Sequence, residues 1–380
     1  MRVRWGYHTV NGDAGSTRGL WLSEPLTADE TYGRRGEHAL DWLARSTVTR
    51  AVKCRRFMNE NVSKLPAKDQ AQMMNSLRER WSSAFFELVV ARLLQEMGAT
   101  IAIEVTSPSG KRPDFSASFA DCAVVVEATT PVVNGEVGEL AKRRIPLLDF
   151  IESHKPAGWS VGVSELPDIG YAESRLPFQR AVRGMLDVPP PRDCDEQREV
   201  VRELSSGTIR MMLVPNRVVE ADVLLWESGM GYCDNTESRI VHAVRRKRGQ
   251  VRDVTLPVLL AIEAGGLSSD LDDFDRALFG RTFSRFGRTG ELEEVGFEAD
   301  GEFAARRAKS PTYAGVLAFR SVGFSACDAP VLYLHPRFAG ALPQAIMGLE
   351  RHSYDPDRNE IVIAAASGAS PVERLDLVVD

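Results

Sequence analysis

Residues 122–129, CAVVVEAT, place a single glutamate in an otherwise almost wholly apolar stretch. A strand that is apolar on both faces must be covered on both faces, so it belongs in the middle of a sheet between layers of helices. Glu127 at its end is costly to bury unless it gains a countercharge or a proton. The stretch therefore predicts a covered sheet with a paired or functional acid in it.

The order of predicted elements indicates the fold class. Apolar spacing predicts helices over 36–64 and 67–97, and strands then mix with helices as far as the C-terminus. We therefore expect an α/β or α+β protein with a mixed central sheet flanked by helices. The expected strands are 100–106, 114–119, 122–129, 159–166, 208–215, 256–264, 313–320, 330–335 and 359–366, and the later helices are 136–154, 173–186, 237–251 and 270–280.

Three regions are expected along the chain. Residues 1–75 form a polar arm followed by helices, and residues 76–190 form the core. Residues 191–380 form a C-terminal αβ region that extends the same sheet or stands beside it. The stretch DVPPPRDCDEQ, 187–197, is rich in proline and is the expected linker between the last two regions.

The charge, cysteine content and apolar runs of the sequence exclude several classes of protein. The net charge of −6 gives no global attraction to nucleic acid or to membranes, so such contacts need a local basic patch. The five cysteines are scattered and form no CxxC pair, which argues against a disulfide framework or a zinc knuckle and favours a reducing cytoplasm. The sequence shows neither the apolar core of a signal peptide nor an apolar run of about 20 residues for a membrane span.

A hairpin is expected to bring two acids together. A two-residue turn at 120–121 pairs Phe119 with Cys122, and this register puts Asp114 opposite Glu127. Facing Cβ atoms lie about 4.5–5.5 Å apart, where like charges repel, so the pair needs a cation between its members or a proton on one of them. Hard cations such as Mg²⁺ bind carboxylate oxygens. Ala-Asp is a weak turn signal, however, and a three-residue loop would separate the acids.

A third acid lies on the preceding helix. Glu87 shares the apolar stripe of Val90 and Leu94, at spacings of three and seven residues. It is therefore expected at the edge of the helix face that packs on the sheet, where a lone carboxylate needs a partner.

These parts together resemble the PD-(D/E)xK nuclease superfamily, and more narrowly a group of uncharacterised, restriction-endonuclease-like bacterial proteins. The matching pieces are a helix with Glu87, a hairpin with Pro113-Asp114, and an apolar strand ending in Glu127-Ala128-Thr129. The expected element order over 76–166, helix–strand–strand–strand–helix–strand, is also that of the superfamily core. The similar segments are FFELVVARLLQEMG, RPDF, VVEAT, LPVLLAIEA, DRALFG and VLYLHPRFAG.

The resemblance implies metal-dependent hydrolysis of nucleic acid phosphodiesters, with DNA as the favoured substrate. It implies that Asp114, Glu127 and the Ala128 carbonyl hold Mg²⁺ or Mn²⁺. Glu87 would reach the ion directly or through water.

The superfamily's lysine, which helps to position the attacking water, is replaced here by Thr129. Arg112 faces Thr129 in the expected register and is the first candidate to supply the missing positive charge. Lys142 and Arg143 on the next helix follow it. The basic run RRKR, 245–248, is read either as a solvated helix face or as a phosphate contact.

Two other functions remain open. The chain can keep the fold without catalysis, as a module that binds nucleic acid or a partner protein. That partner would be a second copy of the chain or a component of a defence system. Alternatively, the acids are structural and pair with Lys111, Arg112 or Arg143.

Overall fold

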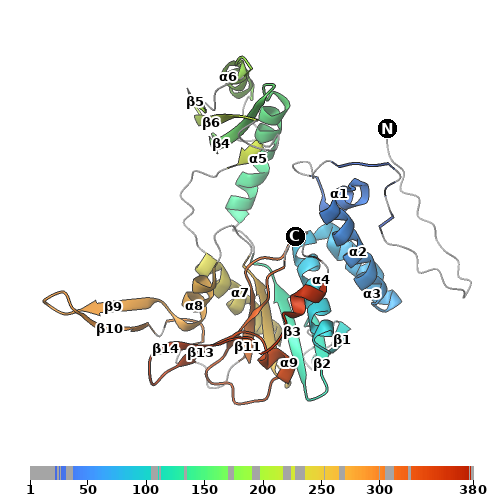
Figure 1. Ribbon diagram of the computed structural model, residues 1–380, viewed down its shortest axis with the longest axis vertical. Coiled ribbons are helices and arrows are strands. Elements are labelled where there is room, and N and C mark those ends of the chain that lie inside the picture. Colours follow the sequence, from blue (N-terminus) through green and yellow to red (C-terminus); the bar gives the residue numbers. More distant parts are fainter. Residues whose placement is uncertain are drawn as a thin grey trace, which may run out of the picture.

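The structure is a computed structural model that describes most of residues 37–375, together with Leu377 and a few residues between 22 and 30. The undescribed internal segments are 104–109, 111–112, 132–134, 170–174, 191–196, 217–223, 227–235, 252, 265–269, 299, 304–311 and 324–326. The described chain is a mixed sheet flanked by helices, with a smaller sheet and a two-stranded ribbon (Figure 1). The expected α+β class is confirmed.

The large sheet has eight strands, and the apolar stretch around Glu127 lies inside it. Across the sheet they are β1 (Thr100–Ile103), β2 (Phe115–Ser118), β3 (Ala123–Thr129), β8 (Val258–Glu263), β11 (Gly315–Phe319), β12 (Val331–Leu334), β13 (Arg351–Asp355) and β14 (Glu360–Ala364). Strands β3, β8 and β11 run parallel at its centre, and β8 and β11 are buried along their whole length. The C-terminal region thus extends the same sheet.

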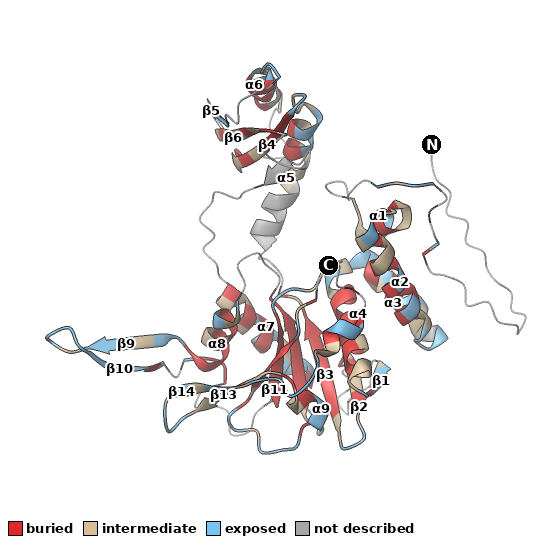
Figure 2. Ribbon diagram, in the orientation of Figure 1, coloured by how far each residue is buried: buried red, intermediate tan, exposed pale blue. Residues whose placement is uncertain are grey.

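Helices cover both faces of this sheet, as the apolar central strands require. On β3, Val126 and Ala128 pack toward the N-terminal helices, while Val125 packs toward the opposite layer. Figure 2 shows the central strands as buried. The first layer comprises α1 (Ala39–Arg45), α2 (Thr49–Ser63), α3 (Ala67–Glu79) and α4 (Trp81–Glu96), joined by the short α9 (Gln344–Met347) and the 3₁₀ turn η1 (Pro371–Leu375). The second layer comprises α7 (Thr236–Val251) and α8 (Leu271–Phe279).

Both expected N-terminal helices are divided. At Arg80 the backbone leaves the helical region (φ −143°, ψ 58°), which ends α3 and lets α4 begin at Trp81. At Ser46 an extended conformation (φ −82°, ψ 138°) separates α1 from α2. Neither break carries a proline or glycine, so local propensity gives no sign of it.

The strand expected at 159–166 does not join the large sheet. Instead β4 (Trp159–Glu165) pairs antiparallel with β6 (Gly207–Pro215) and parallel with β7 (Leu224–Trp226), and β5 (Arg198–Leu204) pairs with β6. The expected boundary at 190 is therefore wrong, because β5 and β6 lie beyond it and pair with β4, which lies before it. The predicted linker leads from α6 (Leu176–Leu186) to β5 within this smaller unit.

This unit lies within the connection between β3 and β8. It follows α5 (Gly135–Ser153) and precedes α7 in the chain, and its core is separate from the two cores of the large sheet. The strand beside β3 is consequently β8, and the helix before that strand is α7. The expected order over 76–166 occurs along the chain as α4, β1, β2, β3, α5 and β4, but β4 belongs to the smaller sheet. In the large sheet, the helix and strand that follow β3 are α7 and β8.

A ribbon of β9 (Thr282–Phe286) and β10 (Leu292–Phe297) extends away from the large sheet (Figure 1). Most of its residues are exposed (Figure 2). Within the described part of the chain, no helix is long and apolar enough to span a membrane.

The separate cores predict independent local stability. Leu213 in β6 and Leu259 in β8 are both fully buried, so replacing either by alanine should cost about 2–5 kcal/mol. Leu213→Ala should reduce amide hydrogen-exchange protection in β4–β6, and Leu259→Ala should reduce it in β3, β8 and β11. Loss of protection in both sheets from either single variant would show that they unfold as one unit.

Candidate functional site

The hairpin has the register that the sequence predicts. Phe115 pairs with Val126 across antiparallel β2 and β3, and the Phe119 N–H donates to the Cys122 carbonyl at 2.9 Å. Continued by one step, this register puts Asp114 opposite Glu127. The alternative three-residue loop, which would separate the acids, is excluded.

Asp114 and Glu127 are joined by reciprocal hydrogen bonds where the β2–β3 ladder ends. The Asp114 N–H donates to Glu127 Oε2 at 3.2 Å, and the Ala128 N–H donates to Asp114 Oδ2 at 2.8 Å. Each carboxylate thus takes a backbone donor from the other strand. Two acids are thereby held as neighbours by bonds that do not depend on a bound ion.

Glu127 is the most deeply buried acid of this site, with 1% of its surface exposed. Loss of hydration first, and then the negative charge of Asp114, raise the pKa of its carboxyl to about 7. A buried acid with this pKa gains a proton readily near neutral pH and binds a cation well when ionised. Such a perturbed carboxyl is typical of functional sites.

The cation beside Glu127 comes from a helix 120 residues away in the sequence. Lys247 Nζ forms an ion pair with Glu127 Oε1, and only 15% of the lysine side chain is exposed. Its neighbour Arg246 donates a hydrogen bond to Thr129 Oγ1 at 3.1 Å. The basic run 245–248 is therefore not simply a solvated face, because two of its members contact the two site residues on β3.

Sequence reasoning missed Lys247, although the sequence carries a signal for it. Lys247 lies seven residues after Ile240, three after Val244 and four before Val251, all of which are buried. Arg248 has similar spacing, but Lys247 is the one basic residue of 245–248 that is not exposed. A cation on such a stripe needs a buried partner, and the sheet beneath it offers Glu127.

Glu87 turns inward from α4, as predicted, and is only 8% exposed. Arg80 forms a two-pronged ion pair with it, at 2.6 and 3.3 Å. Burial first, and the charge of Asp114 next, raise the pKa of the Glu87 carboxyl, while Arg80 and Lys247 oppose the rise. Glu87 therefore lies within electrostatic reach of the acid pair, and Arg80 at the helix break is its direct partner.

The structure does not place the other basic residues proposed from the sequence beside the acid pair. Arg143 forms an ion pair with Asp168 at 3.1 Å, so the expectation that it neutralises the acid pair is wrong. The reason is topological, because α5 leads into the smaller sheet and Asp168 follows β4 there. Lys111, Arg112 and the side chain of Lys142 lie outside the described residues.

The acid pair fits a hard divalent cation, although it is not a closed metal cage. Among the described residues, no group of three or more His, Cys, Asp or Glu side chains is placed to enclose an ion. Mg²⁺ does not require one, since it commonly binds one or two carboxylates and keeps several waters. Asp114 and Glu127 supply two such groups, and Glu87 lies within electrostatic reach of Asp114.

Comparison with known proteins assigns no relatives. No protein-family model, no curated protein and no solved structure matches this chain. The geometry of the acid pair and its lysine therefore carries the functional inference.

The buried ion pair makes the effect of losing Lys247 depend on pH. In the folded protein Glu127 has a pKa of about 7, against an ordinary value of 4.5. The folded state therefore binds more protons between these values, and its stability falls as pH rises from about 4.5 through 7. Without Lys247 the ionised Glu127 carboxylate would stay buried and unpaired. The stability of the folded protein would then fall more steeply as pH rises.

We expect Lys247→Met to lower the free energy of unfolding by about 3 kcal/mol at pH 8. At pH 5, where Glu127 is protonated, the loss should be much smaller. Urea unfolding at the two pH values measures it. Arg246→Met is the matched control on the same helix, because it removes a partly buried hydrogen bond to Thr129 and leaves the Glu127 ion pair in place. Equal losses for Lys247→Met at pH 5 and pH 8 would contradict the ion pair.

Proposed function

We propose that the protein is a metal-dependent phosphodiesterase that hydrolyses nucleic acid, with DNA as its substrate. The observation that carries the proposal is the pair Asp114 and Glu127 at a buried strand end, with the ammonium of Lys247 on Glu127. Two acids and a lysine are the functional groups of the PD-(D/E)xK superfamily that the sequence resembles. In this chain Lys247 on α7 would supply the lysine, because position 129, two residues after Glu127, is a threonine.

The proposal assigns a role to each residue of the site. Asp114 and Glu127 would hold Mg²⁺ or Mn²⁺, with the Ala128 carbonyl as a further ligand. Glu87, held by Arg80, would bind a water of that ion. The bound cation would supply a water of lowered pKa and shield charge on the phosphate.

Lys247 would position the attacking water. The Lys247 ammonium already donates to Glu127 Oε1. A metal ion bound to Glu127 would therefore have this ammonium as a neighbour. An ammonium has three donors, which can bind a water and a phosphate oxygen at the same time. Thr129 lacks such a charge, and its hydroxyl instead accepts a hydrogen bond from Arg246.

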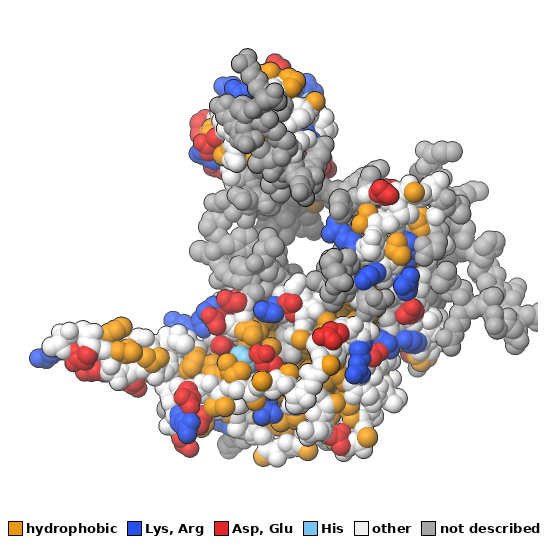
Figure 3. Space-filling model, viewed as in Figure 1, with side chains coloured by type: hydrophobic (Ala, Val, Ile, Leu, Met, Phe, Trp, Pro, Cys, Tyr) orange, Lys and Arg blue, Asp and Glu red, His pale blue; other side chains and the backbone are white. Residues whose placement is uncertain are grey.

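Local cations would bind the substrate backbone. Arg245 and Arg248, on the same run as Lys247, expose 64% and 44% of their side chains, although both pair with buried Glu302. Figure 3 shows acidic and basic side chains interspersed over the visible face of the molecule, without a broad basic field. Attraction to phosphates would therefore come from Arg245 and Arg248 and weaken steeply with salt.

We also propose that the protein works in the cytoplasm. Cys54, Cys122 and Cys327 are free thiols, which suits a reducing cytoplasm.

Cleavage by purified variants tests the proposal. Asp114→Ala and Glu127→Ala should abolish Mg²⁺-dependent cleavage of labelled duplex and single-stranded DNA, because they remove the cation's ligands. Lys247→Met should slow cleavage by roughly 10²–10³, the usual cost of removing one group that stabilises the transition state. Arg246→Met is the control and should keep most of the activity. Full activity in Lys247→Met would remove the lysine from the mechanism.

Moving the lysine provides a sharper form of this test. Residues 127 and 129 point to the same face of β3, so a lysine at 129 would project toward the same site. In Lys247→Met, adding Thr129→Lys should restore much of the lost cleavage. A double variant that folds, binds Mg²⁺ and stays inactive would contradict a shared role for the two positions.

The pKa of Glu127 predicts how metal binding depends on pH. A divalent cation needs the ionised carboxylate, so the rise in melting temperature caused by Mg²⁺ should grow from pH 6 to pH 8. Glu127→Gln should abolish that rise at every pH. A stabilisation by Mg²⁺ that is constant over this range, or that persists in Glu127→Gln, would place the metal elsewhere.

A second candidate function is a non-catalytic module on the same fold, which binds nucleic acid or a protein partner. It is favoured by the ion pairs of Lys247 with Glu127 and of Arg80 with Glu87, which neutralise the acids without a metal. If the natural chain cleaves nothing with Mg²⁺ or Mn²⁺ while Thr129→Lys gains cleavage, this candidate replaces the first.

A further inference from the structure

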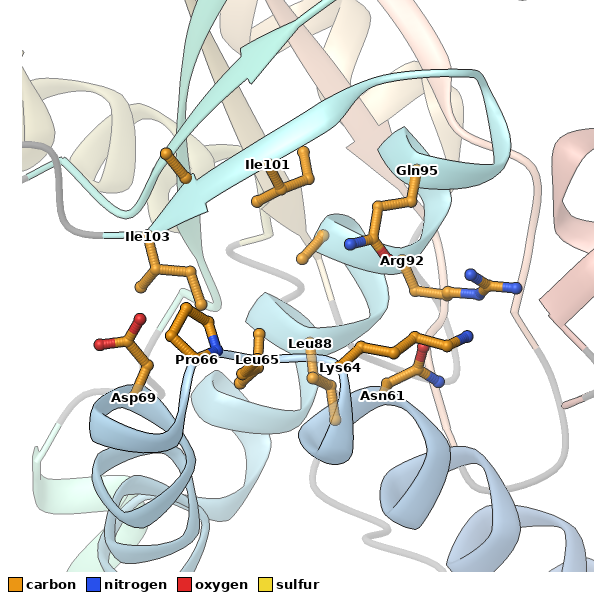
Figure 4. Close-up of a pocket in the computed structure, with 12 residues that line it drawn as sticks. Asn61, Lys64, Leu65, Pro66, Asp69, Leu88, Arg92, Gln95, Ile101 and Ile103 are labelled. Carbon is orange, nitrogen blue, oxygen red and sulfur yellow. The ribbon is translucent and has the colours of Figure 1, made fainter. Parts of the chain in front are cut away.

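The two edges of the large sheet differ in how their apolar side chains are covered. At the β1 edge, Ile101 and Ile103 pack against the first core, and Figure 4 shows Leu65 of the α2–α3 corner across from them. At the β14 edge, Val362 and Ile363 are 42% and 61% exposed. Among the described residues, no strand pairs with the outer side of β14.

Strand β14 lacks the features that usually keep an edge strand from pairing with another chain. Natural edges are protected by lysine, by proline, by bulges or by a covering element. The strand reads Glu-Ile-Val-Ile-Ala over 360–364, pairs with β13 in an unbroken register, and carries a charge only at Glu360. It is therefore a template to which a further strand can be added.

The inner contacts of β14 show which of its backbone groups point outward. Ser353 of β13 pairs with Val362, and the Ser353 hydroxyl donates to the Val362 carbonyl at 3.4 Å, so this carbonyl points inward. Backbone direction alternates along an antiparallel strand, so the N–H and C=O groups of Ile361 and Ile363 point outward. A strand added at this edge would form its hydrogen bonds with these two residues.

The ribbon formed by β9 and β10 has one apolar face. Its register places Leu292 opposite Phe286. Val295 lies opposite Ser284, which is two residues from Phe286 and therefore on the same side. Phe286, Leu292 and Val295 thus share one face, and each is 57–62% exposed. The opposite face carries the charged side chain of Arg285, which forms an ion pair across the two strands.

At its base, this apolar face of the ribbon packs on the large sheet. Phe297 lies on it, opposite Thr282, and its ring centroid is 6.3 Å from that of Tyr354 in β13. The Phe297 N–H also donates to Asn359, in the turn between β13 and β14, at 3.2 Å. From there the ribbon extends away from the sheet on the side of β14 (Figure 1). A two-stranded ribbon is marginally stable by itself in water, so its exposed apolar face needs a cover.

We propose that the protein forms a twofold-symmetric homodimer, in which the β14 strands of two copies pair antiparallel and each ribbon packs on the sheet of the other copy. A pairing centred on Val362 places Ile361 opposite Ile363 of the second copy. Residues whose backbone groups point outward then face each other, as a hydrogen-bonded ladder requires. Glu360 faces Ala364 of the second copy, so no like charges are opposed.

The ribbons lie on the side of this joint sheet that needs to be covered. Ile361 pairs with Tyr354, the residue on which Phe297 packs. Ile361 and Ile363 therefore point to the sheet face on which the ribbon lies. A twofold axis perpendicular to the sheet keeps this face on the same side in both copies. The ribbon of one copy thus covers the isoleucines of the other, and its own isoleucines are covered in return.

The ribbons also bring the interface closer to the size of a stable one. Stable interfaces involve about 20–30 residues on each side. Strand β14 supplies five, and β9 and β10 add five and six. The dimer rests on these contacts alone and does not depend on the proposed activity.

The mass of the protein in solution tests the dimer. Light scattering after gel filtration should give twice the chain mass of 42.0 kDa. Ile363→Lys should give a monomer with an unchanged circular dichroism spectrum, because this side chain is exposed in the single chain and its charge would oppose Ile361 of the second copy. Val201→Lys is the matched control and should stay dimeric, since Val201 is 43% exposed on β5, an edge strand of the smaller sheet.

Cross-linking tests the register. Under mild oxidation Val362→Cys should form a disulfide-linked dimer, because the two copies of this residue face each other across the axis at a Cα separation of about 4.5 Å. Glu360→Cys should not cross-link, because residue 360 faces residue 364 of the second copy. The natural chain, treated in the same way, shows any background from its own cysteines.

A double variant tests the ribbon. Phe286→Ser with Leu292→Ser should raise the dissociation constant of the dimer by about tenfold or more, because two large apolar side chains lose their cover. Both side chains are exposed in the single chain, so the variant should keep its fold.

A natural chain that is monomeric at every concentration tested, or a dimer that Ile363→Lys leaves intact, would overturn the proposal. Equal cross-linking of Glu360→Cys and Val362→Cys would overturn the strand pairing. An unchanged dissociation constant in the double variant would overturn the role of the ribbon.

Discussion

The ion pair between Lys247 and Glu127 is the interaction on which the rest of the site depends. Glu127 is fixed in a buried position by the apolar strand around it, so the protein must bring a cation to it. That cation arrives on α7, after a connection that contains an entire second sheet. The burial that makes β3 a good central strand also raises the pKa of Glu127 and makes it a good cation site.

Supplying the lysine from α7 couples the site to the packing of the whole sheet. A lysine two residues after Glu127 would be in place as soon as β3 formed. Lys247 is in place only when Ile240 and Val244 are packed against the sheet, because these three residues share one stripe of the helix. The chemistry would thus appear only in the fully folded protein, with α7 closing one side of the site.

Much of this site could be predicted from the sequence, because its acids are local. The hairpin places Asp114 opposite Glu127 through strand parity and turn length, and Glu87 follows from helix spacing. Lys247 could not be placed, because its partner lies 120 residues away and local periodicity does not tell which strand a helix covers. The smaller sheet was missed for the same reason, since β4 reads like any buried strand. The break at Arg80 carries no proline or glycine, so it also escaped prediction.

The central claim is that Asp114 and Glu127 jointly hold a divalent cation that takes the place of the Lys247 ammonium on Glu127. A crystal structure of the protein with Mn²⁺, read from the anomalous signal of the metal, tests this most directly. The account predicts one Mn²⁺ bound by both carboxylates, with Lys247 Nζ moved off Glu127 Oε1 and still beside the ion. A structure at saturating Mn²⁺ with no metal on these acids and the Lys247–Glu127 pair intact would contradict it.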